Sequence, residues 1–177
     1  MSQISRAEIV EMIHDATAAV FSTMLNLPAD QRPDRQEQGD PAPVDGVVAL
    51  LGIGGPWTGT GRIYCSADFA RQLAGALLMT EFSAVDGEVL DAVAEVANMI
   101  IGNLKTTLES RLGPLALSVP TVVYGRNYQA RTAMAHDWIV VPFSCGGETM
   151  DIRFCLMPTP DRTPMHLLRH EPAPAIG

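Results

Sequence analysis

The stretch DAVAEVANMIIGN, residues 91–103, decides the fold because it lies inside a long amphipathic segment and reads as helix from end to end. At about 100° per residue, the polar residues of this segment fall close to one line along the helix. This polar stripe consists of Asp91, Glu95, Asn98, Gly102, Lys105 and Glu109. The opposite side is apolar and carries Leu90, Val93, Ala97, Ile100, Ile101, Leu104 and Leu108. The pattern predicts a long helix that buries one face and exposes the other.

Two more helices are expected before this segment. Apolar residues recur at helical spacing across residues 4–25, which predicts an amphipathic helix near the N-terminus. A second helix is expected to start after Ser66, a typical N-cap residue. The long helix itself is expected to begin near the acidic Asp86 and to end near Leu112, because Gly113 follows.

The other periodic segments predict strands. Residues 44–55 and 57–66 read as a pair of strands, and the first is apolar on both faces, as central strands usually are. The glycines of GIGG and GTG in this region are interpreted as hairpin glycines. Three later strands are expected at residues 116–125, 137–144 and 148–158, the last two joined by a Gly-Gly turn. This order predicts an α+β domain with a mainly antiparallel sheet, packed with two long helices plus an N-terminal helix.

The chain is expected to form one domain over residues 1–158. Residues 27–43 contain four prolines and no aliphatic pattern, so we expect an exposed connection with little regular structure. The tail at 159–177 has no periodic pattern and is expected to be peripheral.

Composition excludes several classes of partner. The net charge of −8 and a pI near 4.8 argue against nucleic acid and anionic membranes, which bind clustered lysines and arginines. No run of about 18 apolar residues is present, and the N-terminus lacks the apolar stretch of a signal peptide. We therefore expect a cytoplasmic protein that does not enter a membrane.

Cysteine and histidine spacing gives no sign of a metal site. Cys65, Cys145 and Cys155 are odd in number and lack a CxxC pair, so buried free thiols are expected. The histidines lack the spacing of a zinc site. We expect this chain to bind no cofactor of its own.

The polar stripe has two interpretations. A Glu and an Asn on the outer face of an amphipathic helix are usually only solvated. Three details favour a binding surface instead: Asn98 is a poor mid-helix residue, Gly102 costs about 1 kcal/mol relative to alanine, and the apolar Met99 lies near the edge of the same face.

The array Asp91-xxx-Glu95-xx-Asn98, followed by 21 residues and Pro120, resembles the signature of the CheC/CheX family of bacterial chemotaxis phosphatases. The flanking segments AVFSTMLNL, GTGRIYCSADFARQLAGALL and EVANMIIGNLKTTL also resemble CheX. The likeness spans roughly residues 5–157. The motif occurs once, as in CheX, whereas CheC carries it twice.

The resemblance implies a phosphatase for the aspartyl-phosphate of a CheY-like response regulator. Glu95 would pair with a lysine in the active site of the receiver domain, and Asn98 would position the attacking water. Mg²⁺ would be held by the receiver. Further residues that would contact the partner are Asp91, Met99, Gly102 and Lys105. Pro120 would be a structural part of the motif, and the chain would form a homodimer by joining sheets.

The sequence leaves two other functions to consider. The first is a non-catalytic binding or adaptor module of the same fold, which would contact a response regulator or another signalling partner without hydrolysis. The second is a small-molecule hydrolase, which is disfavoured because the sequence offers no set of nucleophile, base and oxyanion donors.

Overall fold

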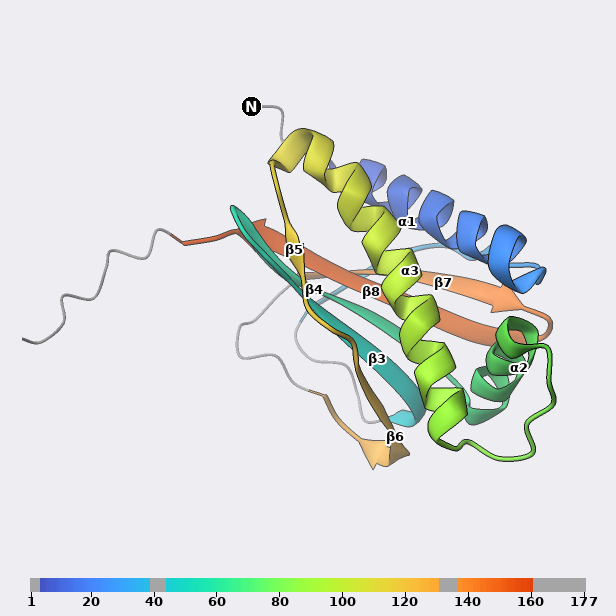
Figure 1. Ribbon diagram of the computed structural model, residues 1–177. Coiled ribbons are helices and arrows are strands. Elements are labelled where there is room, and N and C mark those ends of the chain that lie inside the picture. Colours follow the sequence, from blue (N-terminus) through green and yellow to red (C-terminus); the bar gives the residue numbers. More distant parts are fainter. Residues whose placement is uncertain (1–3, 39–43, 131–136, 161–177) are drawn as a thin grey trace, which may run out of the picture.

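The protein folds into a curled antiparallel sheet with helices packed against it (Figure 1). The computed structural model describes residues 4–38, 44–130 and 137–160. Its helices are α1 (Arg6–Val20), the π-helical turn η1 (Phe21–Leu25), α2 (Ala67–Leu78) and α3 (Gly87–Leu112). Its strands are β1 (Asp30–Gln31), β2 (Arg35–Gln38), β3 (Val44–Gly54), β4 (Trp57–Cys65), β5 (Ala116–Leu117), β6 (Thr121–Tyr128), β7 (Asp137–Cys145) and β8 (Glu148–Pro158). The predicted α+β class is confirmed. The expected peripheral tail lies outside the described residues from residue 161 on.

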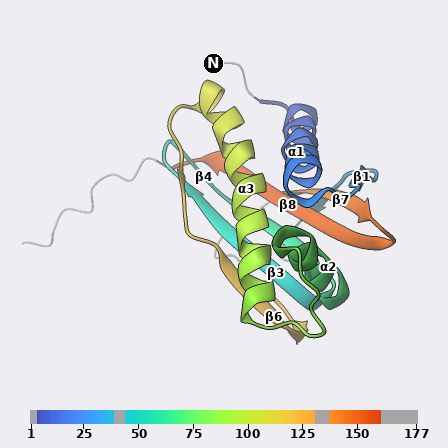
Figure 2. The ribbon, with the colours of Figure 1, turned by 45° about the vertical axis from the view of Figure 1, so that its right-hand side comes forward.

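The sheet has the strand order β1-β7-β8-β4-β3-β5, with β2 also paired to β7 and β6 also paired to β3. Every strand pair is antiparallel. The expected central strand is β3, which lies between β4 and β6 (Figure 2). β7 and β8 are joined by a turn in which Gly146 and Gly147 both have positive φ, 60° and 94°. This is the backbone that a two-residue hairpin turn requires, and it confirms the Gly-Gly turn.

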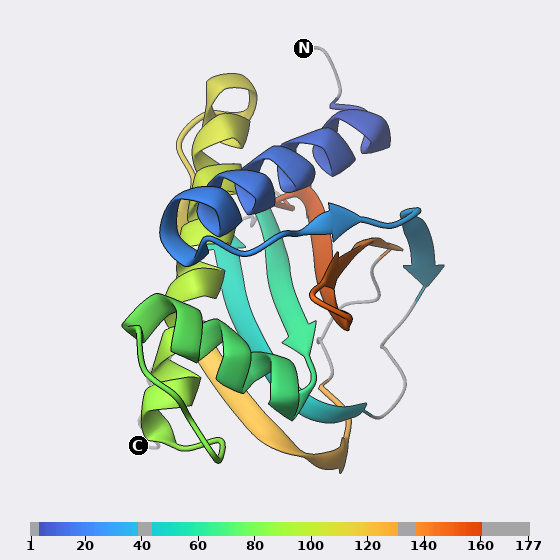
Figure 3. The same cartoon turned by 90° about the vertical axis from the view of Figure 1, so that its right-hand side faces the viewer.

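The helices cover one face of the sheet and share a core with it (Figure 3). α3 contributes the largest share, because its apolar face is buried along the whole helix. Its buried residues are Val89, Ala92, Val93, Val96, Ala97, Ile100, Ile101, Leu104 and Leu108. In the part of the chain that the structure describes, no helix is both long and apolar enough to span a membrane.

Both ends of α3 are fixed by local hydrogen bonds. Asp86 is the N-cap, and its side chain accepts a hydrogen bond of 3.0 Å from the Val89 amide. The helix ends at Gly113, whose φ of 81° favours glycine. Both predicted ends of the helix are confirmed.

The connection at residues 27–43 is more ordered than expected. Its described part contains β1 and β2, which both pair with β7. Arg35 donates a hydrogen bond of 3.0 Å to Asp151 on β8, and Glu37 accepts one from Arg153. Burial alone would raise the pKa of Glu37, but the guanidiniums of Arg35 and Arg153 hold it below its usual value. These long-range ion pairs order a polar segment that has no apolar pattern of its own.

The segment expected as one strand at residues 116–125 is divided. β5 ends at Leu117 and β6 begins at Thr121, with Pro120 directly before β6. Between them, the Ser118 hydroxyl accepts a hydrogen bond of 2.9 Å from the Gly52 amide. Proline lacks an N–H for a strand ladder, which explains why Pro120 lies in the break between strands.

The interpretation of the GTG glycines as glycines of a hairpin turn is wrong. They lie within the strand β4. A Cβ at Gly59 would lie 2.1 Å from the carbonyl oxygen of Cys155 on β8. A Cβ at Gly61 would lie 2.8 Å from the Ile101 side chain of α3. Gly61 therefore lets α3 approach the sheet closely and fixes the depth at which the helix is seated.

α1 is attached to the end of α3 by a charged pair. Ser5 and Glu8 form a capping box at the start of α1. Glu8 also accepts a hydrogen bond from Arg111, in the last turn of α3. The hydrogen bond from the Ser5 backbone and the contact with Arg111 lower the pKa of Glu8 to about 2. This pair links the two helices at one end of the helix layer.

Candidate functional site

The polar stripe lies on the exposed side of α3, with α1 and α2 on one side of the helix and β6 on the other (Figure 2). Asp91, Glu95 and Asn98 are exposed. In the ranges that the structure describes, no hydrogen bond or ion pair joins the side chain of Glu95 or Asn98 to another residue. A carboxylate and an amide therefore stand free for an external partner.

The backbone beneath these two side chains is held firmly. Val96 and Ala97 lie between Glu95 and Asn98 in the sequence and are buried, as are Ile100 and Ile101 in the next turn. Residues three apart on a helix have Cβ atoms about 5–6 Å apart and share one face. Glu95 and Asn98 are thus presented together, on a rigid element, at a distance that suits one shallow site.

The other end of the stripe is already paired within the chain. Lys105 lies 2.9 Å from Glu109, and Glu109 also accepts a hydrogen bond of 2.8 Å from the Leu115 amide. The Leu115 hydrogen bond and Lys105 hold the pKa of Glu109 below its usual value. Lys105 therefore stabilises the end of α3, and it would contact a partner only at the cost of this pair.

Gly102 leaves the helix backbone bare one turn after Asn98. It lies in the middle of regular helix, and a Cβ built there would meet no atom within 4 Å other than its chain neighbours and the nearby backbone of its own helix. Packing within the chain therefore does not require glycine at this position. Met99, expected at the edge of the exposed face, is only partly exposed because it packs against the core. Pro120 is not part of α3 and lies directly before β6.

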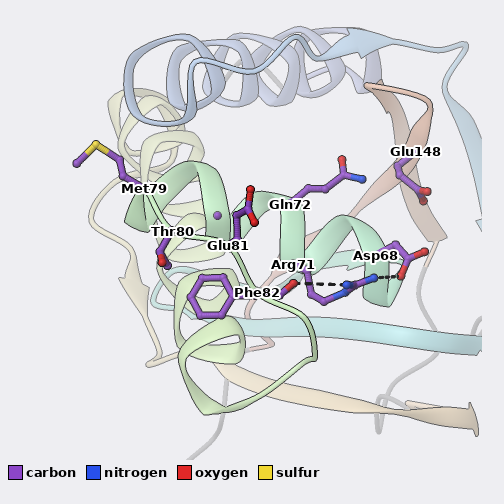
Figure 4. Close-up of a pocket in the computed structure, with 9 residues that line it drawn as sticks. Asp68, Arg71, Gln72, Met79, Thr80, Glu81, Phe82 and Glu148 are labelled. Atoms are coloured by element: carbon purple, nitrogen blue, oxygen red, sulfur yellow. Dashed lines mark hydrogen bonds and ion pairs between the residues drawn. The ribbon is translucent and has the colours of Figure 1, made fainter.

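A surface beside α2 was missed by the sequence analysis. Met79, the C-cap residue of α2, has a positive φ of 53° and a relative exposure of 92%. It lies at one end of an open hollow of about 610 Å³, between α2 and the loop that leads to α3 (Figure 4). The other lining residues include Asp68, Arg71, Gln72, Glu81, Phe82 and Glu148. The sequence feature that points to this surface is the absence of glycine at the C-cap of α2, where Met79 lies instead.

The three cysteines are buried, as expected. Burial raises the pKa of the Cys65 and Cys145 thiols to about 12. Thiols with such pKa values carry almost no thiolate at neutral pH, so these residues act as small apolar core residues.

Comparison with known proteins identifies the family. A family model described as "Chemotaxis phosphatase CheX" matches residues 47–144, which is more than half of the chain. The chain belongs to the CheX family. The matched region of this CheX-family chain includes most of β3, all of α2 and α3, and most of β7, and so contains the whole polar stripe. No match was found among curated proteins.

Solved structures agree with the CheX fold. Chemotaxis protein CheX from Vibrio vulnificus is 24% identical, covers 85% of this chain and 99% of its own, and has a TM-score of 0.75. CheX in the CheX–CheY–BeF3–Mg²⁺ complex from Borrelia burgdorferi is 23% identical, with coverages of 84% and 97% and a TM-score of 0.73. FliY from Thermotoga maritima is 19% identical, with coverages of 88% and 92% and a TM-score of 0.65. At these identities the likeness establishes the fold of the CheX-family chain.

Proposed function

We propose that this CheX-family chain accelerates hydrolysis of the aspartyl-phosphate on a CheY-like receiver domain. The observation that carries the proposal is the pair Glu95 and Asn98, exposed on one rigid helix and unpaired within the described chain. The matching family is one of chemotaxis phosphatases, and a relative of similar fold forms a complex with CheY. A receiver partner would also place this chain in the cytoplasm.

Asn98 is the proposed catalytic residue. Its amide oxygen accepts a hydrogen bond from water and its amide nitrogen donates one, so it can orient a water molecule without deprotonating it. The water oxygen would attack phosphorus in line with the bond to the aspartyl oxygen. That bond breaks, the aspartate leaves as a carboxylate, and the water protons pass to the released phosphate and solvent. Phosphoryl transfer depends mainly on positioning and charge stabilisation, so one well-placed amide suffices.

Glu95 is the proposed orienting residue. A carboxylate one turn before Asn98 can pair with a lysine on the receiver and so fix the register of α3 on its partner. The Mg²⁺ that stabilises the phosphoryl oxygens would belong to the receiver. The complex from Borrelia burgdorferi, which contains CheX, CheY, BeF3 and Mg²⁺, supports this division of roles.

A second candidate function is a non-catalytic module that docks on a receiver. The chain shares its fold with FliY as well as with CheX, and a shared fold alone does not fix the function. The adaptor has no use for a water-positioning amide, whereas the phosphatase depends on it. A measurement of hydrolysis therefore distinguishes the phosphatase from the adaptor, whereas a measurement of binding does not.

The test is phosphate release from phosphorylated receiver domains of the source organism, measured with Mg²⁺ in the presence and absence of this chain. The phosphatase predicts faster release from at least one receiver. Binding of a receiver without faster release would favour the adaptor and overturn the phosphatase.

We also propose a homodimer that joins sheets at the β6 edge. In the described part of the chain, β6 pairs only with β3. Val119 is 84% exposed next to this edge, and Val123 and Tyr124 on β6 are also exposed. Exposed strand edges with apolar side chains readily pair with another chain. Changing Val123 and Tyr124 together to lysine should convert the dimer to monomer in sedimentation velocity, and an unchanged mass would contradict this interface.

Gly102→Ala should separate stability from activity. Alanine in a helix interior is more stable than glycine by about 0.5–1 kcal/mol, and the new methyl group meets no atom beyond its own helix backbone and chain neighbours. We expect a higher melting temperature but about tenfold lower kcat/KM, because the methyl group would stand between α3 and the receiver. Gly87→Ala, which also places its methyl group in open space, serves as the control. Full activity in Gly102→Ala would show that Gly102 is merely tolerated.

A further inference from the structure

The large apolar side chains exposed in the described chain fall into two groups. Val119, Val123 and Tyr124 lie at the β6 edge. The second group consists of Met24 near the end of η1 and Leu78 and Met79 at the end of α2, with relative exposures of 51%, 47% and 92%. We call this second group the helix-end patch. The helix-end patch belongs neither to the polar stripe nor to the β6 edge.

The helix-end patch belongs to the same helix layer as α3, which carries the polar stripe. η1 contacts α2, and in two views it lies beside the end of that helix (Figures 1 and 3). α2 in turn packs against α3. In Figure 4 Met79 lies at the edge of the hollow, and its side chain points outward from the helix layer. A partner that docks on α3 and extends over the end of α2 would therefore meet Met79.

The backbone at Met79 is unfavourable for methionine. Its φ of 53° and ψ of 41° are in the left-handed region, where helix C-caps usually carry glycine. The turn is closed by a hydrogen bond of 3.3 Å from the Thr80 amide to the Gly75 carbonyl. Because Met79 is almost fully exposed, packing within the chain does not compensate for this conformation. A large apolar residue in a strained, exposed position indicates a role outside the chain.

The loop after Met79 is held in place by Arg71. Its guanidinium donates hydrogen bonds of 3.4 and 3.3 Å to the carbonyls of Phe82 and Ser83, and it also pairs with Asp68 (Figure 4). These contacts fix the loop between α2 and α3. Met79 is thus presented in a defined place, which lowers the entropic cost of docking.

Charge around the patch indicates the chemistry of its partner. Glu81 follows Met79 by two residues, and Glu88, Asp91 and Glu95 lie on the exposed side of α3. Across the described ranges, none of these four carboxylates forms an ion pair. A complementary partner has an apolar depression flanked by basic side chains. This description fits a receiver that presents a lysine to Glu95.

We propose that the helix-end patch is the apolar half of the receiver-docking surface, with the polar stripe as its catalytic half. The proposal rests on the proposed receiver partner and adds how that partner is held. Methionine suits this role because its flexible, polarisable side chain adapts to a partner surface. Met79 then sets affinity and specificity for the receiver, while Asn98 sets the rate of hydrolysis.

The test uses three variants of Met79 in the full chain. Met79→Asn removes the apolar surface, adds no charge and tolerates the left-handed backbone, and Met79→Gly relieves the strain. Met79→Leu retains apolar area and is the matched control. The dissociation constant of each is measured for a beryllofluoride-activated receiver domain with Mg²⁺, together with kcat at saturating receiver.

We expect Met79→Asn and Met79→Gly to raise the dissociation constant about tenfold, with kcat unchanged and the melting temperature unchanged or higher. Met79→Leu should keep native affinity. If all three variants bound a receiver as tightly as the native chain does, this proposal would be overturned and the proposed function would stay intact. Failure of the native chain to bind any receiver of its organism would overturn both. A change in oligomeric state caused by Met79→Asn would assign the patch to a second copy instead.

Discussion

An Asn98→Ala variant should fold like the native chain and lose nearly all acceleration of receiver dephosphorylation. Asn98 is exposed and its side chain forms no hydrogen bond within the described residues, so its removal costs the fold little. Alanine also has a higher helix propensity than asparagine, so the free energy of unfolding should stay equal or rise by about 0.5 kcal/mol. The reaction loses the only group proposed to orient the water, so we expect kcat to fall at least about a hundredfold. Phosphate release measures the rate, and thermal unfolding measures the stability.

Asn103→Ala is the matched control for this experiment. Asn103 is also exposed on α3, but it lies outside the polar stripe and lines a groove between α3 and α1. Its replacement should leave dephosphorylation unchanged. If Asn98→Ala retained the native rate, the water-positioning role would be wrong. If both variants lost activity equally, a general disturbance of α3 would be the better explanation.

The sequence predicts α3 well because the information for this helix is local. Its apolar period, its N-cap Asp86 and its terminal Gly113 all lie within the segment, and the structure confirms each. The stripe follows from helical geometry alone, so the exposure of Glu95 and Asn98 could be anticipated.

The elements that were mispredicted depend on contacts distant in sequence. β1 and β2 have no apolar alternation and are ordered by pairing with β7 and by the Arg35–Asp151 ion pair, whose partners are 116 residues apart. The GTG glycines follow the same rule, since only the packed structure reveals that Gly61 faces Ile101. Neither feature leaves a periodic signal in the sequence.

The residues of the candidate site also divide into those set by local sequence and those set by contacts distant in sequence. The spacing of Glu95 and Asn98 is a property of one helix, whereas the pairing of Lys105 and Glu109 is reinforced by Leu115 beyond the helix end. The missing C-cap glycine of α2 does not by itself identify Met79 from sequence, because apolar residues near a helix end are usually buried. Only the structure reveals that this one is exposed and has a positive φ.

Reversing the charge of Glu95 should weaken docking and affect the chemical step much less. In Glu95→Lys, an ammonium would face the basic group that the carboxylate is proposed to pair with on the receiver. We expect KM to rise by about tenfold to a hundredfold. Glu95→Gln, which removes the charge but keeps the shape, should have a smaller effect. Since Glu95 is exposed and unpaired in the described chain, neither change should lower the melting temperature appreciably.

The dependence on ionic strength distinguishes a charge effect at Glu95 from a loss of catalysis at Asn98. Added salt screens exposed charges, because the Debye length falls from about 10 Å at 0.1 M to about 3 Å at 1 M. The difference in KM between Glu95→Lys and the native chain should therefore shrink as salt is raised, whereas the defect of Asn98→Ala in kcat should not. Glu11→Lys makes the same charge change at an exposed site on α1 and should leave KM close to native. If Glu11→Lys weakened docking as much as Glu95→Lys, net charge would control association and the proposed pairing of Glu95 with a receiver lysine would be wrong.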